Sequence, residues 1–206
     1  MYPTASVMTR PNPYKRPDRF TVEAKKAGFP ARSVFKLEEI DRRLRLIRPG
    51  MHVLDLGSSP GSWSLYVAKH IGAKGKLLSI DLNPLGVALP EPAIFIQGDA
   101  LALTNDDLAT FAPYDVVLSD MAPKTTGNRL GDQTRSFELY MHALDVAAAH
   151  CKPGGAFVGK IFMGEDLPLA RTEVKKHFAK ERILKPESSR SVSYEIFLVG
   201  EGKKST

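Results

Sequence analysis

Two charged residues interrupt runs of the sequence that otherwise favour β-strands. Lys160 lies inside A-F-V-G-K-I-F (residues 156–162), and Glu195 lies inside S-Y-E-I-F-L-V (residues 193–199). A charged side chain in a buried strand destabilises a fold unless it is paired or borders a cleft. The simplest interpretation is a structural salt bridge between Lys160 and Glu195. The alternative is that both belong to a polar active site.

Two further charged residues lie where they could join such a site. The run Y-D-V-V-L-S (residues 114–119) predicts a strand that delivers Asp120 at its end. In open α/β sheets, ligands bind at the carboxyl ends of the strands. Lys36 lies on a predicted helix beside the opening of the sheet, and taken alone it is typical of an ordinary surface lysine.

The stretch from Met51 to Leu82 predicts a β-loop-α-β unit that opens a Rossmann-like sheet. Its loop has only Gly57 and Gly61, four residues apart, and no lysine follows them. It therefore matches neither a dinucleotide fingerprint nor a P-loop. Pro60 also removes one backbone donor from a loop that would have to surround a pyrophosphate. The pattern favours a nucleoside ligand without phosphates.

Two carboxylates follow predicted strands of this sheet. Asp81 comes twenty residues after Gly61, where a carboxylate can accept hydrogen bonds from a ribose diol. Asp99 follows the run 93–97 and could accept a bond from an exocyclic amine, or equally it could cap the next turn. S-adenosylmethionine (SAM) fits these features, because it is an adenosine without phosphates. The alternative is an α/β sheet whose first strand simply ends in a glycine turn.

Predicted helices and strands along the chain must position these residues. Apolar residues spaced by three and four predict a helix that begins near Pro30 and ends at Pro49-Gly50, and its core positions are Leu37, Ile40, Leu44 and Ile47. No regular structure is expected before about Asp18. The later elements are expected at residues 93–97 (strand), 114–119 (strand), 133–151 (helix), 156–162 (strand), 167–179 (helix), 182–185 (strand) and 193–199 (strand).

Composition limits the class of protein. The chain has 206 residues and 43% hydrophobic residues, enough for one well-buried domain with an N-terminal extension. Cys151 is its only cysteine, which excludes an internal disulfide and a multi-cysteine zinc site. There is no apolar run of about 18 residues and no apolar signal core at the N-terminus. We therefore expect a soluble, cytoplasmic protein that does not associate with membranes.

Positive charge is concentrated near the N-terminus. Residues 1–50 hold 12 of the 29 Lys and Arg and 5 of the 23 Asp and Glu, a net charge of +7, against −1 for the remainder. Basic residues interleaved with aromatic ones indicate binding to a polyanion such as RNA, although a solvated arm is the alternative. The candidate phosphate contacts are Arg10, Lys15, Arg16, Arg19, Lys25, Lys26 and Arg32.

Five motifs, in order, carry a resemblance to a known family. They are A-R-S-V-F-K-L-E-E-I-D, D-L-G-S-S-P-G-S-W-S, S-D-M-A-P, P-G-G-A-F-V-G-K-I-F and K-P-E-S-S-R-S-V-S-Y-E-I-F-L-V. Together they resemble the FtsJ/RrmJ (RlmE) family of ribosomal RNA 2′-O-methyltransferases, collinearly from about Asp18 to Val199. Ser58, Ser59 and Ser62 depart from the alanine or glycine expected in many relatives, which should alter hydrogen bonding in the loop without removing the site.

The resemblance implies a fold and a site. The fold would be a Rossmann-like α/β methyltransferase domain with a seven-stranded, mostly parallel sheet whose last strand is antiparallel. We expect a basic, partly disordered, RNA-contacting extension (1–30), the methyltransferase domain (31–200) and a polar tail (201–206). The family's K-D-K-E tetrad falls on Lys36, Asp120, Lys160 and Glu195. Its SAM contacts fall on Gly57, Gly61, Trp63, Asp81, Asp99 and Asp120.

The expected reaction explains these residue types. A ribose 2′-hydroxyl is a poor nucleophile, whereas the methyl group of SAM is already activated, so the enzyme must chiefly aim and deprotonate the alcohol. Lys160 would be the base or the group that orients the hydroxyl, with Asp120 and Glu195 positioning the two lysines. The product would be S-adenosylhomocysteine, and no metal is required. The resemblance implies a uridine in 23S ribosomal RNA, on the assembled large subunit during ribosome maturation.

Other functions would require residues that differ from those in this sequence. A C5-methyltransferase needs a nucleophilic cysteine, but Cys151 lies before Lys152-Pro153-Gly154, away from the predicted strand ends. An amino-group methyltransferase would carry an aromatic residue after a Pro-Pro pair where this chain has D-M-A-P-K (120–124). A non-catalytic RNA-binding protein would have lost tetrad members, and none is lost. Methylation of transfer RNA or another RNA stays open, and we expect a monomer.

Overall fold

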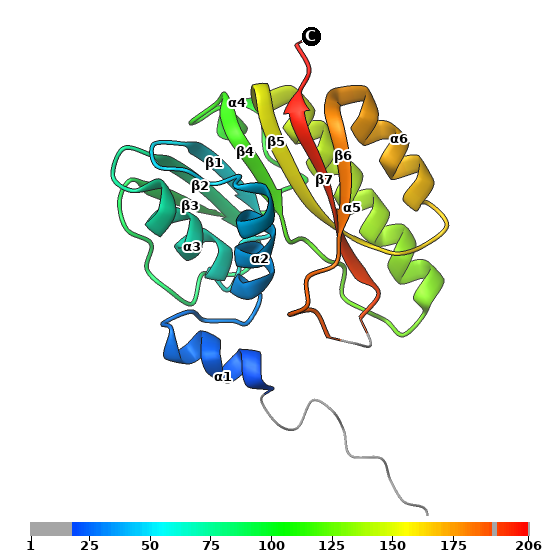
Figure 1. The fold of residues 1–206 in the computed structure, drawn as a ribbon, viewed down its shortest axis with the longest axis horizontal. Coiled ribbons are helices and arrows are strands. Elements are labelled where there is room, and N and C mark those ends of the chain that lie inside the picture. Colours follow the sequence, from blue (N-terminus) through cyan, green and yellow to red (C-terminus); the bar gives the residue numbers. More distant parts are fainter. Residues whose placement is uncertain (1–17, 191–192, 206) are drawn as a thin grey trace, which may run out of the picture.

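A twisted seven-stranded sheet forms the centre of the computed structural model, which describes residues 18–190 and 193–205 (Figure 1). The strand order is β3-β2-β1-β4-β5-β7-β6. Neighbouring strands are parallel except at β7, which is antiparallel to both β5 and β6. The predicted fold class is confirmed. The strands are β1 (His52–Leu56), β2 (Lys76–Asp81), β3 (Ala93–Gln97), β4 (Tyr114–Ser119), β5 (Cys151–Phe162), β6 (Phe178–Leu184) and β7 (Glu195–Lys203).

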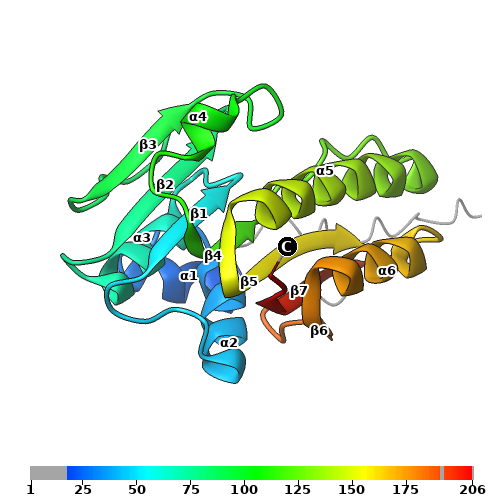
Figure 2. The same cartoon turned by 90° about the horizontal axis from the view of Figure 1, so that it is seen from above.

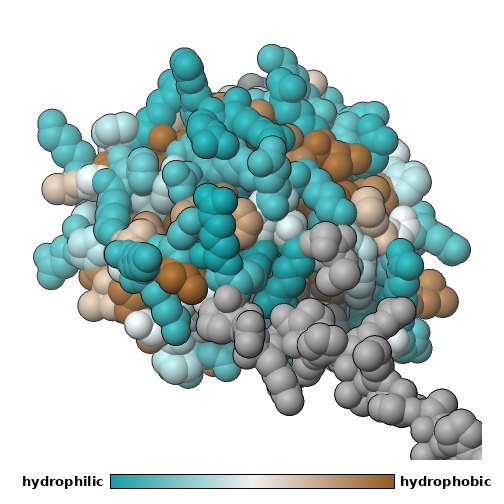
Figure 3. Space-filling view, turned by 60° about the horizontal axis from the view of Figure 1, so that its bottom comes forward, coloured by the Kyte–Doolittle hydropathy of each residue, from teal (hydrophilic) through white to brown (hydrophobic). Residues whose placement is uncertain are grey.

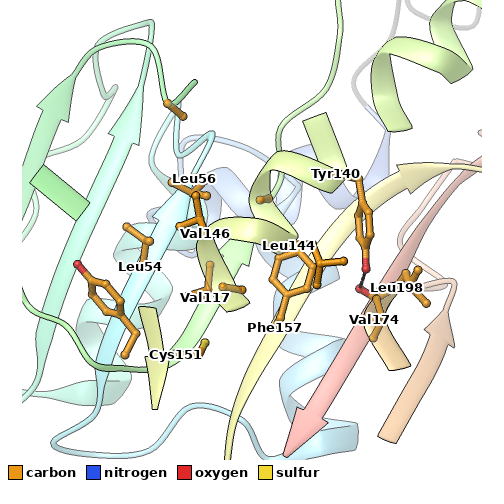
Figure 4. Close-up of a cluster of buried hydrophobic side chains, with 14 of the residues drawn as sticks. Leu54, Leu56, Val117, Tyr140, Leu144, Val146, Cys151, Phe157, Val174 and Leu198 are labelled. Carbon is orange, nitrogen blue, oxygen red and sulfur yellow. Dashed lines mark hydrogen bonds between the residues drawn. The ribbon is translucent and has the colours of Figure 1, made fainter. Parts of the chain in front are cut away.

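Helices cover both faces of the sheet, as Figure 2 shows. They are α1 (Arg19–Lys26), α2 (Val34–Leu44) and α3 (Ser62–Ile71) on one face, and α4 (Asn105–Leu108), α5 (Arg129–His150) and α6 (Leu167–His177) on the other. Alternating side chains of each strand supply the two cores: Val53 packs with α2 and α3, whereas Leu54 and Leu56 pack with α5. In the α5 core, Tyr140 donates its hydroxyl to Leu198 O at 3.4 Å (Figure 4).

The expected N-terminal extension contains a helix that sequence patterns did not indicate. Asp18 caps α1 by accepting a hydrogen bond from Thr21 N at 3.0 Å. Ala24 is buried, and the Phe20 ring lies 5.7 Å from that of Phe35 on α2. A helix of 8 residues carries too few apolar positions for a clear period, and its packing on α2 stabilises it instead.

Several element boundaries also differ from the predicted ones. Helix α5 begins at Arg129, before residue 133, and β5 begins at Cys151, because Cys151 already pairs with Tyr114 of β4. Strand β6 begins at Phe178, where a helix was expected, because it pairs with β7 as far as Lys203. Residues 201–203, expected in a polar tail, therefore belong to β7. Cross-strand pairing decides these boundaries, and a local pattern does not record it.

The docking of α2 against α3 depends on one buried carboxylate. Asp41 accepts hydrogen bonds from Ile47 N at 2.9 Å and from the Tyr66 hydroxyl at 3.0 Å. Trp63 on α3 adds a bond from its indole nitrogen to Ser33 O at 2.8 Å, just before α2 begins. Because Lys36 lies in the first turn of α2, these contacts fix its place beside the sheet.

Replacing Tyr66 tests this docking. In Tyr66→Phe the second oxygen of Asp41 loses its buried donor, so the free energy of unfolding should fall by about 1–2 kcal/mol. Chemical denaturation monitored by circular dichroism measures the change. Tyr140→Phe is the matched control, because its hydroxyl makes a longer bond of 3.4 Å and should matter less. A smaller loss in Tyr66→Phe than in the control would contradict this account of the docking.

Candidate active site

A cavity of about 530 Å³ lies at the carboxyl ends of β1, β2 and β4. This is the edge at which open α/β sheets bind ligands, and the volume lies within the usual range for small-molecule sites. Figure 3 brings the lower edge of Figure 1 forward and shows a mostly hydrophilic surface with small separate hydrophobic patches. The cavity is lined by Gly57, Ser59, Asp81, Leu82, Asn83, Asp99, Ala100, Leu101, Asp120, Met121, Ala122, Pro123, Lys124, Leu139 and Lys160.

Lys160 and Asp120 form a buried ion pair at one side of this cavity. The Lys160 ammonium lies 2.8 Å from Asp120 Oδ1 but is not aligned for a hydrogen bond to it. It donates instead to the main-chain carbonyl of Asp120 at 2.5 Å. Asp120 Oδ1 is buried, and the Lys160 ammonium is the cation that faces it.

Lys36 and Glu195 form a second ion pair, with both side chains mostly buried. Ser189 also donates a hydrogen bond to Glu195 at 3.3 Å. Burial alone would raise the pKa of Glu195, but Lys36, Lys160 and the Ser189 bond outweigh it and hold the pKa below its ordinary value. Glu195 is therefore a carboxylate. The direct Lys160–Glu195 salt bridge suggested by the strand patterns is not formed, because each residue has a different partner.

Strand pairing brings the two ion pairs together. Ser119 at the end of β4 pairs with Gly159, which places Asp120 beside Lys160. Across the antiparallel β5–β7 pair, Phe162 is opposite Glu195 and Lys160 is opposite Phe197. Since alternate residues of a strand share a face, Lys160 and Glu195 point to the same side of the sheet. Helix α2 covers that side and supplies Lys36.

The glycine loop approaches the cavity closely. A Cβ atom on Gly57 would lie 2.7–2.9 Å from Met121 atoms, so a side chain there would displace the loop that follows β4. Asp81 accepts hydrogen bonds from Ser59 N at 2.9 Å and from Asn83 N at 2.7 Å, which orients its carboxylate at the cavity wall. Asp99 also lines the cavity, while it accepts a bond from Leu101 N at 2.9 Å.

Two of the expected cofactor contacts do not line the cavity. Gly61 begins α3 with a φ of 104°, and a Cβ atom there would lie 2.6 Å from Val87. Trp63 is only 2% exposed and packs on Phe197. Both therefore hold α3 and the glycine loop in place. Ser62 does the same, because its hydroxyl bonds with the main chain of Ala31.

Four of the seven candidate phosphate contacts lie in the part of the chain that the structure describes. Arg10, Lys15 and Arg16 lie outside the described residues. Lys25 and Lys26 are exposed at the end of α1, and the exposed Arg19 pairs with Glu23 at 2.7 Å. Arg32 pairs with Asp18 and donates to Ser188 O, which ties the start of the chain to the segment before β7.

Sequence patterns missed a buried carboxyl group under the site. Asp55 on β1 is fully buried and accepts a bond from Ser64 Oγ at 2.6 Å, while its other oxygen has no donor among the described residues. Burial raises the pKa of Asp55 to about 7, the Ser64 bond opposes that shift, and nearby Asp120 and Asp81 add to it. The signal that the sequence offers for it is an acidic residue within the otherwise apolar V-L-D-L-G (residues 53–57).

The loop after β4 is held by a second residue that sequence patterns missed. Asp132 on α5 is 1% exposed and accepts bonds from Thr126 N at 3.0 and 3.1 Å and from Thr126 Oγ1 at 3.0 Å. Arg135 pairs with it from the next turn of α5. These bonds fix the far end of the segment that contains Met121, Pro123 and Lys124, three cavity residues.

Two kinds of site are not found in the part of the chain that the structure describes. Within residues 18–190 and 193–205, no group of three or more His, Cys, Asp or Glu side chains could hold a metal ion. The helices of those same residues include none long and apolar enough to cross a membrane.

Comparison with known proteins places the chain among RNA-modifying enzymes. Residues 29–203 match the family model of the FtsJ-like methyltransferases. The chain is 60% identical to the ribosomal RNA large subunit methyltransferase E of Sorangium cellulosum, and the match covers 97% of this chain and 94% of that one. It is 50% identical to the protein of the same name from Bdellovibrio bacteriovorus, and that match covers 93% of this chain and 99% of the relative. A Plasmodium falciparum structure, provisionally named a ribosomal RNA methyltransferase, has a TM-score of 0.74 at 25% identity, covering 86% of this chain and 100% of that one.

The pKa of Asp55 predicts a pH dependence of stability. Because the pKa of Asp55 is about 7 in the folded protein, Asp55 keeps a proton there that the unfolded chain releases near pH 4. Its contribution to the free energy of unfolding is therefore full below about pH 4 and is lost as the pH rises to about 7. Asp55→Asn has no such proton and should be more stable than wild type by about 2–4 kcal/mol at alkaline pH.

The difference in the free energy of unfolding between wild type and Asp55→Asn isolates the contribution of Asp55. It should shrink towards zero as the pH falls to about 4, and urea unfolding of both proteins across the pH range measures it. A difference independent of pH would show that Asp55 does not titrate in this range.

Proposed function

The chain belongs to the FtsJ-like methyltransferase family, and we propose that it methylates the ribose 2′-hydroxyl of a uridine in 23S ribosomal RNA, with SAM as the methyl donor. The observation that carries the proposal is the meeting of the Lys36–Glu195 and Lys160–Asp120 ion pairs beside the cavity. The two relatives named above are, by their names, methyltransferases of large-subunit ribosomal RNA. We infer that the substrate is the assembled large subunit, modified in the cytoplasm by a monomer during ribosome maturation.

The residues of the cavity fit SAM. Asp81 would accept hydrogen bonds from the ribose diol, and Asp99 would accept one from the exocyclic amine of adenine. The carboxylates of Asp81 and Asp99 at the cavity suit a ligand that brings positive charge and N–H groups. When bound, SAM supplies a methyl group activated by a positively charged sulfur, and S-adenosylhomocysteine is the product.

The two ion pairs act together on the substrate hydroxyl. Asp120 holds the Lys160 nitrogen through its carboxylate and its carbonyl, so the lysine has a fixed direction. Glu195 on β7 holds the Lys36 ammonium through its carboxylate. A neutral amine at Lys160 would take the proton of the 2′-hydroxyl, whereas an ammonium would only orient the oxygen. We propose the first role, because the alcohol must lose its proton during methyl transfer.

The RNA contacts complete the proposal. Arg19, Lys25, Lys26 and Arg32, with Arg10, Lys15 and Arg16 before them, would bind phosphates and make binding sensitive to salt. The N-terminal extension (1–30) would therefore be an RNA-binding segment attached to the methyltransferase domain.

Labelled SAM tests the proposed function directly. The protein is incubated with it and with either undermethylated large ribosomal subunits or total transfer RNA, and the modified nucleotide is then mapped. The proposal predicts label at the 2′-oxygen of one uridine of 23S ribosomal RNA. Label confined to transfer RNA would overturn the target, and label on a base would overturn the reaction.

Substitution of Lys160 tests the base. A guanidinium keeps its charge at any working pH, so Lys160→Arg should lose as much activity as Lys160→Ala, at least about 100-fold in single turnover. Both variants should bind SAM with normal affinity. Lys180→Arg, which changes an exposed lysine of β6, is the control and should stay active. Substantial turnover by Lys160→Arg would refute the role as a base and leave the orienting role.

Substitution of Asp81 tests the cofactor site. A charge-assisted hydrogen bond contributes roughly 1.5–3 kcal/mol, so Asp81→Ala should raise the Kd for SAM by about tenfold or more. Isothermal titration calorimetry measures the change, and Asp106→Ala on the exposed face of α4 is the control. Wild-type affinity in Asp81→Ala would remove this carboxylate from the site.

A further inference from the structure

An aromatic cluster adjoins the ion pairs but forms no part of them. Tyr194 directly precedes Glu195, and its ring meets that of Phe162 at 4.7 Å with an interplanar angle of 69°. Phe162 lies two residues after Lys160 and is opposite Glu195 in the β5–β7 pair. The Tyr194 carbonyl also accepts a hydrogen bond from Met163 N at 2.9 Å. The ring is thus held by the same two strands that hold Lys160 and Glu195.

A cation lies over the Tyr194 ring. The guanidinium carbon of Arg129 is 5.4 Å from the ring centroid, within the range of a cation–π contact. Arg129 is exposed, and no carboxylate within the described residues pairs with it. It is also the first residue of α5, where the helix dipole disfavours a cation. The Tyr194 ring is thus the favourable contact that the described residues give this arginine.

Exposed apolar side chains continue the same surface. Leu130, next to Arg129, is 63% exposed, and Met163, next to Phe162, is 38% exposed. Gln133 on α5 donates a hydrogen bond to Met163 O, which holds the end of β5 against the start of α5. We call Arg129, Phe162, Met163 and Tyr194 the Tyr194 wall. It combines aromatic and thioether groups with a guanidinium that no carboxylate of the described residues pairs, and Tyr194 directly precedes Glu195 in the chain.

We propose that the Tyr194 wall stacks the nucleobase of the nucleotide whose 2′-hydroxyl reaches Lys160. A nucleobase is planar and apolar on its faces, and its phosphates are negative, so an aromatic surface with an adjacent guanidinium matches both parts. The inference rests on the proposed function and extends it to the state of the substrate. A base that stacks on Tyr194 is not paired in a duplex, so the target nucleotide must be unpaired when it is methylated.

Four variants test the Tyr194 wall. Tyr194→Leu removes the aromatic face, Tyr194→Phe keeps it, Arg129→Gln removes the cation, and Ile183→Ala changes an exposed apolar residue of β6 as a control. Each is assayed for methylation of undermethylated large ribosomal subunits, with KM and kcat measured separately. The Kd for SAM and the Tm of each variant show whether the fold is intact.

Stacking on one aromatic side chain predicts a specific set of results. Tyr194→Leu should raise the KM for subunits about tenfold, and Tyr194→Phe should restore it. Arg129→Gln should raise KM and lower the salt dependence of binding by about one phosphate contact. SAM affinity should stay at the wild-type value throughout, and Ile183→Ala should match wild type in KM. A purely structural role for Tyr194 would instead lower Tm and SAM affinity together.

The outcomes separate this inference from the proposed function. If wild type is active but Tyr194→Leu and Arg129→Gln both keep a KM within about twofold of it, the stacking role is overturned and the methyltransferase function stands. If Tyr194→Leu does not fold, the KM of Arg129→Gln, a variant of an exposed residue, tests the stacking role alone. A KM within about twofold of wild type then overturns it. If wild type methylates no RNA, the proposed function fails and this inference fails with it.

Discussion

The ion pair between Lys160 and Asp120 is the constraint on which the site depends. A lysine that is only 8% exposed destabilises a sheet unless an anion faces it, and the parallel pairing of β4 with β5 provides that anion from the neighbouring strand end. The same requirement applies to Glu195 on β7. The antiparallel insertion of β7 beside β5 places it next to Lys160, and the docking of α2 supplies Lys36 as its partner. Strand order and helix docking together thus pair four mostly buried charges.

The cavity wall formed by the glycine loop carries a different arrangement of charges. There, carboxylates gather around the glycine loop, with Asp81 lining the cavity and Asp55 buried beneath it, and the ion-paired Asp120 lies nearby. Burial is the main cause of the raised pKa of Asp55, and the nearby Asp120 and Asp81 add to it. The negative charge of these carboxylates favours a ligand that brings positive charge. A nucleoside with a cationic sulfur satisfies this wall, whereas a phosphate would be repelled.

Much of this arrangement could be predicted from the sequence, because the reacting residues break strong local patterns. Lys160 and Glu195 interrupt strands, and Asp120 ends one, so each is visible without a structure. The pairing between them was not predictable, because it depends on which strands are neighbours and in which direction they run. Helix α1 and the early start of β5 were missed for the same reason: tertiary packing and cross-strand bonds stabilise them. The hydrogen bonds of Asp55 and Asp132 likewise join residues that no local period connects.

The central claim is that the two ion pairs act as one unit on the substrate hydroxyl. The most direct measurement is a double-mutant cycle that changes one member of each pair, with Lys36→Ala and Asp120→Asn assayed singly and together for single-turnover methyl transfer. If the pairs act as a unit, the double variant will be much faster than the product of the two single losses predicts. If the losses multiply to within about twofold, the pairs act independently and the account is contradicted.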